Sequence, residues 1–348
     1  MKVKRPLLIL VTIILVACLL MGLVACSGGQ QKTADSGQQA PADSENTDQA
    51  KDNKDITIGF ILMSRSTEFL VAEEWGAVEE AKRQGVELIV IDGENSSERQ
   101  VASAEDLIAK GVDALILNPY NSGGIVAAVE KANEAGIPVI TVDSIAAGGD
   151  VDVHVGFDNI EGGRMAAEYL AETLGVKGTV LEIHGPLGAF HAENRHKGFI
   201  EVMEKHPDIE VITIEAPEWA SDKGREATMD TLTANPDLAA IYSHSDNMLI
   251  GAIPALEQSG RLFPLGDEKH MPVVGIDAAP FGMKGVREGW IDVTFGQDPV
   301  WMGEEAVKAA IKLINGEEVE EFVNMTPIVV TKENVEDENL WANKFANN

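Results

Sequence analysis

Two stretches of this sequence share one plan, and that plan limits what the chain can fold into. Residues 136–144 read GIPVITVDS and residues 271–277 read MPVVGID, so each places a proline, a short apolar run and then an aspartate. Such a run is too short for a helix and apolar on both sides, which is typical of an inner parallel strand covered by helices. Ligands of open α/β sheets bind beyond the carboxyl ends of the strands. The two stretches therefore predict two α/β halves that present Asp143 and Asp277 to a shared cleft.

Regular alternation of strand and helix patterns supports this fold class. Strands are predicted to start near residues 56, 86, 113 and 137, with helical patterns between them. After Asp158 the pattern begins again, with strands predicted at 180–183, 211–214, 239–242 and 273–276. This alternation indicates right-handed crossovers and parallel sheets. Two sheets fit usual domain sizes better than one very large sheet, so we predict two doubly wound parallel-sheet lobes.

The first residues have the form of an export signal. Lys2, Lys4 and Arg5 precede an apolar run over residues 7–24, and the run ends in the sequence LVAC at residues 23–26. This ending resembles the cleavage box of bacterial lipoproteins, in which the cysteine becomes a lipidated N-terminus. An earlier LVAC at residues 15–18 would leave an apolar tail after cleavage, and an uncleaved anchor is the remaining alternative. We predict a signal peptide over 1–25 and lipidation at Cys26.

The next segment changes composition. Residues 26–55 are rich in Ser, Gly, Gln, Asp and Asn and contain no branched apolar residue, which predicts a disordered tether. Both cysteines of the chain lie at or before residue 26, so the folded body has no disulfide and no cysteine nucleophile.

Charge and missing motifs exclude several functions. The formal net charge is −30, which disfavours nucleic acid and anionic membranes as partners of the folded body. The turn after the first strand reads MSRSTEF, without the glycines of a dinucleotide site, and neither a Walker A nor a GxSxG motif is present. Four histidines, His184, His191, His196 and His244, fall in the second half without a standard metal-ligand spacing. We therefore predict no enzyme activity, no cofactor and no metal.

Several segments resemble one family. These are, in order, AGIPVITVD, GFDNIEGGRMAAEYL, ENRHKGF, HSDNMLIGA, VVGIDAAP and FGQDP. They are similar to the ribose-type periplasmic sugar-binding proteins of ABC importers, over about residues 56–332. The resemblance implies the type I solute-binding fold, a monomer whose two lobes are joined by a three-strand hinge. It implies lobes of 56–157 plus 298–325 and of 158–297 plus 326–348.

The resemblance also implies a set of ligand-binding residues. They are Thr67, Phe69, Asn118, Asp143, Ser144, Arg195, Trp219, Ser245, Asp277 and Gln297. Ser144 stands where ribose binders have an arginine, Ser245 stands where asparagine is common, and Leu70 replaces a frequent second aromatic residue. Because lost hydrogen-bonding groups change discrimination strongly, these departures argue against ribose itself.

The chemistry of these residues suits a neutral sugar or polyol. Carboxylates accept hydrogen bonds from neighbouring hydroxyls, an arginine donates two, and aromatic rings cover the C–H face of a sugar. Other roles stay open at this point. Asp143 and Asp277 are candidate helix N-caps, Asn118 a turn former, Trp219 a core residue and Arg195 the partner of a surface acid.

Together with the predicted lipidation of Cys26, the resemblance implies a receptor that is lipid-anchored at the outer face of the cytoplasmic membrane. It would close around its ligand and deliver it to a membrane permease with cytoplasmic ATPases. The alternative is a sugar or signal-molecule receptor that feeds a sensor kinase or a chemoreceptor.

Overall fold

The computed structural model describes residues 52–175 and 177–346. The predicted signal peptide, Cys26 and the tether up to residue 51 lie outside the described residues. The predicted tether boundary at residue 55 stays a prediction. Asp52 caps a short 3-10 helix, η1 (Asn53–Asp55), and the Asn53 side chain donates a hydrogen bond of 2.9 Å to the carbonyl of Gln84.

Six strands form the first sheet, and neighbouring strands are parallel throughout. Their order is β11-β5-β4-β3-β1-β2. Because Leu117 pairs with both Ile61 and Thr141, the carboxyl ends of the three central strands lie at one edge. The strands are β1 (Thr57–Leu62), β2 (Glu87–Asp92), β3 (Ala114–Leu117), β4 (Val139–Val142), β5 (Val153–Phe157) and β11 (Phe322–Met325).

The second sheet repeats this plan with one exception. Its order is β12-β10-β9-β8-β6-β7, and only the edge strand β12 runs antiparallel to its neighbour. Asp277 ends β9 and pairs with Gly296 at the end of β10. The strands are β6 (Gly178–His184), β7 (Ile209–Glu215), β8 (Ala240–Ser243), β9 (Val273–Asp277), β10 (Val293–Gly296) and β12 (Ile328–Val330).

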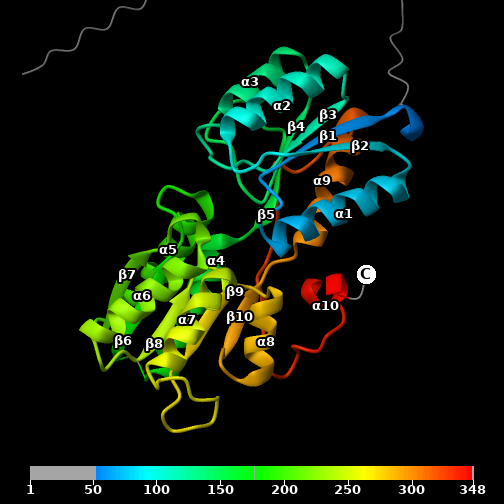
Figure 1. Ribbon diagram of the computed structural model, residues 1–348. Coiled ribbons are helices and arrows are strands. Elements are labelled where there is room, and N and C mark those ends of the chain that lie inside the picture. Colours follow the sequence, from blue (N-terminus) through cyan, green and yellow to red (C-terminus); the bar gives the residue numbers. More distant parts are fainter. Residues whose placement is uncertain (1–51, 176, 347–348) are drawn as a thin grey trace, which may run out of the picture. The chain divides into compact units, whose positions relative to one another are not determined.

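Helices cover both faces of each sheet (Figure 1). In β1, Ile58 and Phe60 pack in the cluster that includes residues of α1 and α9, whereas Ile61 packs with residues of α2 and α3. This alternation explains why the strand is apolar on both sides. The helices of this lobe are α1 (Glu68–Gln84), α2 (Ser97–Lys110), α3 (Val126–Glu134) and α9 (Pro299–Ile314).

The helices of the second lobe also cover the two faces of their sheet. Val180 and Tyr242 pack in the cluster that includes residues of α4 and α5, while Leu181 and Ile241 pack with residues of α6, α7 and α8. These helices are α4 (Asn159–Thr173), α5 (Phe190–Met203), α6 (Ser221–Ala234), α7 (Asp246–Gln258) and α8 (Pro280–Glu288). A short turn, η2 (Pro217–Trp219), precedes α6, and α10 (Trp341–Ala346) follows β12.

The chain passes between the two sheets at three places. It leaves the first sheet after β5, returns after β10 into α9, and crosses again between β11 and β12. The predicted fold class, two doubly wound parallel-sheet lobes joined by a three-strand hinge, is confirmed. The predicted residue boundaries of the lobes stay predictions.

Within residues 52–175 and 177–346, no helix combines the length and the apolar character needed to cross a bilayer.

Candidate functional site

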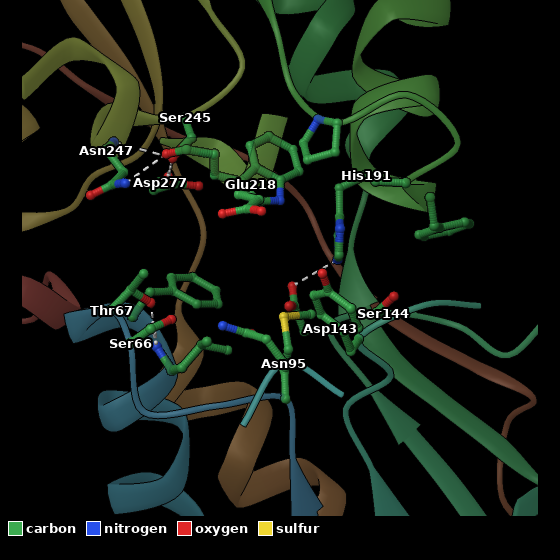
Figure 2. A pocket seen from close by; sticks show the side chains of 18 of the residues that line it. Ser66, Thr67, Asn95, Asp143, Ser144, His191, Glu218, Ser245, Asn247 and Asp277 are labelled. Carbon is green, nitrogen blue, oxygen red and sulfur yellow. Dashed lines mark hydrogen bonds and ion pairs between the residues drawn. The ribbon is translucent and has the colours of Figure 1, made fainter. Parts of the chain in front are cut away.

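A cavity of about 700 Å³ is lined by residues of both lobes, at the carboxyl ends of their strands. Figure 2 shows Asp143 and Ser144 on one side of the open space and Ser245 and Asp277 on the other. Nine of the ten predicted ligand residues line this cavity: Thr67, Phe69, Asp143, Ser144, Arg195, Trp219, Ser245, Asp277 and Gln297. Contact between these residues and a ligand stays a prediction.

Asp143 follows β4 and has a left-handed backbone, with φ of 60°. Its Oδ1 lies 3.3 Å from Nε2 of His191, which belongs to α5 in the other lobe. Burial alone would raise the pKa of Asp143, but the neighbouring His191 and Arg195 outweigh burial and hold that pKa below its usual value. Asp143 therefore presents a charged carboxylate to the cavity.

Asp277 ends β9, and the protein surrounds its carboxylate with donors. Gln297 Nε2 donates to Oδ1 and Ser245 Oγ donates to Oδ2, both over 2.6 Å. Nη1 of Arg195 lies 3.7 Å from Oδ1. Burial raises the pKa of Asp277, and Arg195, Ser245 and Gln297 offset part of that effect. The neighbouring Asp246 is fully buried, and burial followed by the charge of Asp277 raises its pKa well above the usual value.

Neither acid is the N-cap of a helix. The N-cap of α8 is Ala279, and β4 is followed by β5 without an intervening helix. Both acids instead stand at strand ends with positive φ, which turns the backbone away from the sheet at the edge of the cavity.

Arg195 is buried and bound on several sides. Its Nε donates to Oδ1 of Asn159 over 2.8 Å, and Nη1 donates to the carbonyl of His244. The guanidinium carbon also lies 5.7 Å from the ring centroid of Trp219. Arg195 is therefore not paired with the surface acid Glu193, which was one of its alternative roles.

Two aromatic rings are fixed in the wall of the cavity. Trp219 lies against Gly185, where an added Cβ would come within 2.3 Å of ring atom Cζ3. Only a glycine leaves room for the indole at this distance. Phe69 meets Trp341 edge to face, with 6.0 Å between ring centroids. Both rings line the cavity, so Trp219 is not a fully buried core residue.

Thr67 and Ser245 each cap a helix and also line the cavity. Thr67 is the N-cap of α1 and accepts from the amide of Leu70, whereas Ser245 is the N-cap of α7 and accepts from the amide of Asn247. The Thr67 hydroxyl also has a proton to donate, so its cap does not exhaust its hydrogen-bonding capacity, whereas the Ser245 hydroxyl already donates to Asp277.

Asn118 is the predicted ligand residue that the structure places away from the cavity wall. It is fully buried, and its Nδ2 donates to both carboxylate oxygens of Glu73 over 3.1 Å. Burial, followed by the charge of Asp143, raises the pKa of Glu73 well above its usual value. Oδ1 of Asn118 has no hydrogen-bond partner among the described residues. The amide is therefore held inside the first lobe.

Two histidines of the second lobe bind a buried acid, Glu182. Glu182 accepts from Nε2 of His244 over 2.9 Å and from Nδ1 of His196 over 3.0 Å. The ring of His184 meets that of His196 edge to face and lies tilted against that of His244. Burial raises the pKa of Glu182, but these partners outweigh it and lower the pKa to about 2. In the described part of the chain, no group of three or more histidine, cysteine or acidic side chains is arranged to hold a metal ion.

Some residues of the cavity wall were missed from sequence. His191 is the clearest case, and Phe190, Asn247, Asn95 and Tyr120 also line the cavity. Because His191 precedes Arg195 by four residues on α5, the two share one helix face, and the Arg195 prediction carried a signal for His191. The loop residue Asn95, which follows β2, gave no comparable signal.

Comparisons with known proteins agree with this geometry. A family model described as a periplasmic binding protein domain matches residues 58–318. The ribose import binding protein RbsB of Bacillus subtilis is 33% identical over 271 residues, which cover 78% of this chain and 86% of that protein.

Two solved structures are similar over nearly their whole length. A periplasmic solute-binding protein of an ABC transporter from Actinobacillus succinogenes, with bound D-allose, is 33% identical with a TM-score of 0.74, covering 81% of this chain and 99% of that chain. A solute-binding protein of an ABC transporter from Bacillus halodurans, with bound myo-inositol, is 31% identical with a TM-score of 0.76, covering 84% and 100%.

Two doubly wound lobes with a polar, aromatic-lined cavity between them define a solute-binding protein. The chain belongs to the periplasmic binding protein family, and the resemblance to sugar-binding proteins of ABC importers is confirmed. Members of this family act outside the cytoplasm as binding proteins, so the chain is not an enzyme.

Proposed function

We propose that this protein is an exported lipoprotein that captures a neutral sugar or polyol in its interlobe cavity and delivers it to an ABC importer. Cys26 would carry the lipid and tether the folded body to the outer face of the cytoplasmic membrane. The LVAC sequence after an apolar run supports this anchor.

The observation that carries the proposal is the set of side chains that line the cavity. Asp143, Asp277 and Arg195 face one space together with the rings of Phe69 and Trp219. Carboxylates and a guanidinium give directed, charge-assisted hydrogen bonds to hydroxyls, while the rings cover C–H groups. Relatives whose structures hold D-allose and myo-inositol support the same ligand class for this chain.

Charge in the cavity favours a neutral ligand. The first lobe contributes the charged carboxylate of Asp143, and Arg195 is already 3.7 Å from Asp277. A phosphate or carboxylate on the ligand would lie beside these acids without an unpaired guanidinium to receive it. Sugar phosphates and sugar acids should therefore bind poorly.

A thermal-shift screen of the purified full-length chain tests the proposal. The panel holds D-ribose, D-allose, xylitol and myo-inositol, with amino acids and sugar phosphates as the opposing set. A ligand at 100 times its Kd adds about 2.7 kcal/mol to the free energy of unfolding, so a true ligand raises the midpoint clearly. We expect a neutral sugar or polyol to do so.

Variants of the cavity provide the control. Asp277→Ala and Trp219→Ala should abolish the shift, whereas Asp106→Ala, an exposed position on α2, should preserve it. A shift produced only by amino acids or phosphates would contradict the proposal.

A further inference from the structure

His191 lines the cavity and was not among the predicted ligand-binding residues. It lies in the first turn of α5 in the second lobe, and 7% of its surface is exposed. The facing acid, Asp143, belongs to the first lobe. Figure 2 shows the His191 ring directed across the space between the lobes at the Asp143 carboxylate.

The contact between these side chains is close and nearly dry. Nε2 of His191 lies 3.3 Å from Oδ1 of Asp143, and 9% of each side chain is exposed. Nε2 has no hydrogen bond of good geometry to any described residue, so Asp143 is the polar group that offsets its burial. An opposite charge at this distance counts for more in a dry cleft than at a surface.

The other groups around His191 leave Asp143 as its counterion. Trp219 meets the imidazole edge to face, with 6.1 Å between centroids. His154, on β5, stays neutral, because burial lowers its pKa to about 4. Arg195, on α5 itself, is already bound to Asn159 and His244 and faces Asp277. Glu218, which precedes Trp219, also lines the cavity.

We propose that His191 is a positioning residue for ligand capture, holding the Asp143 carboxylate through an ion pair that crosses the cleft. This inference rests on the proposed function. Because its two members come from different lobes, the pair forms only when the lobes are together, and it therefore favours the closed arrangement. The pair occupies Oδ1 of Asp143 and leaves Oδ2 to accept a ligand hydroxyl.

The proposal predicts that ligand affinity depends on the His191 side chain. The pKa of Asp143 lies below its usual value, so its carboxylate is charged and attracts a donor across the cleft. Without His191 this carboxylate loses its close partner from the other lobe, so affinity should fall.

Calorimetric titration of the full-length chain tests this. The probes are D-ribose, D-allose, xylitol and myo-inositol. His191→Gln should bind the best probe of the wild type about ten-fold more weakly than the wild type does, which is the loss of one charge-assisted contact. His206→Gln, a histidine outside the cavity lining, should behave as wild type.

The outcomes separate the two proposals. If the wild type binds a probe and His191→Gln keeps the wild-type affinity, the positioning role is overturned while the proposed function stands. If the wild type binds none of the four probes, both are overturned. His191→Phe, which keeps an aromatic ring, replaces His191→Gln if that variant does not fold. Non-additive losses in His191→Gln, Asp143→Asn and the double variant would support a direct pair, and additive losses would overturn it.

Discussion

The two strand-end acids of the cavity differ in how much of their hydrogen-bonding capacity the protein already uses. Asp277 accepts from Ser245, Gln297 and the amide of Asp246. Asp143 has one close side-chain partner among the described residues, His191. Asp143 is therefore the more available acceptor for a ligand hydroxyl, while Asp277 contributes mainly through the donors it orients.

Replacing Gly185 by alanine tests whether the position of the Trp219 ring matters for sugar binding. The new Cβ would lie 2.3 Å from Cζ3 of Trp219, so the indole must move. We expect Gly185→Ala to weaken sugar binding by up to about ten-fold, which approaches the binding free energy that one aromatic contact contributes. The free energy of unfolding should change less. Calorimetry with the best-binding sugar measures this.

The matched control is Gly123→Ala. Its Cβ would meet only Asn121 Oδ1, at an ordinary 3.5 Å, and Gly123 is not a lining residue. Equal affinities of the wild type and Gly185→Ala would show that the position of the Trp219 ring is unimportant.

Among the elements, inner strands with an uninterrupted apolar run were predictable, and strands beside the crossings were not. The inner strands β1, β3, β4 and β9 are buried apolar runs with turn residues after them, so their ends, and with them Asp143 and Asp277, followed from the pattern. Strands β5, β10, β11 and β12 have three to five residues and lie beside the crossings, where the apolar pattern is interrupted. They were not predicted as strands.

The direction of side chains could not be predicted from the sequence either. A sequence places Asn118 at the end of β3 but says nothing of the buried Glu73 that captures its amide. The same holds for the contact between His191 and Asp143, which joins two lobes and depends on how they meet. Local pattern therefore predicted positions along the chain better than partners in space.

The pairing of β4 with β5 gives a prediction for pH. Thr141 and His154 face each other in register, and Thr141 Oγ1 lies 3.0 Å from Nδ1 of His154. Burial lowers the pKa of His154 to about 4, so on acidification the unfolded chain takes up the proton first. The stability that the neutral, buried His154 contributes is fully present above about pH 6.5. It is lost as the pH falls toward 4, by about 1.4 kcal/mol per pH unit.

Chemical denaturation at pH 7 and pH 5 measures the effect. The free energy of unfolding of the wild type should fall by about 2 kcal/mol more than that of His154→Gln over this interval. His206→Gln should follow the wild type. A parallel decline in wild type and His154→Gln would contradict the assignment.

At the scale of the whole molecule, α10 contacts both lobes. Trp341 packs against Phe69 of α1, and its Nε1 donates a 2.8 Å hydrogen bond to the carbonyl of Asp277. Phe345 meets Trp75 of α1 edge to face, with 6.1 Å between centroids. One short helix therefore braces a predicted ligand residue in each lobe.

Trp341→Phe tests this brace. The ring is kept in part, but the buried carbonyl of Asp277 loses its donor, which should lower the free energy of unfolding by about 1–3 kcal/mol. Sugar affinity should fall as well, because the Asp277 backbone is less well fixed. Trp290→Phe, at a tryptophan outside the cavity lining, should leave affinity unchanged. Unchanged affinity in Trp341→Phe, measured by calorimetry, would show that α10 does not influence the cavity.

The repeated crossing of the chain also governs how the protein matures. A ribosome delivers residues in order, and each sheet takes its final strand, β11 or β12, from residues beyond 320. During synthesis the earlier half of the chain therefore has an incomplete sheet whose outermost strand lacks its neighbour. The two lobes must finish folding together, after almost the entire polypeptide has been made, so a stalled or shortened chain would leave neither half in its native form.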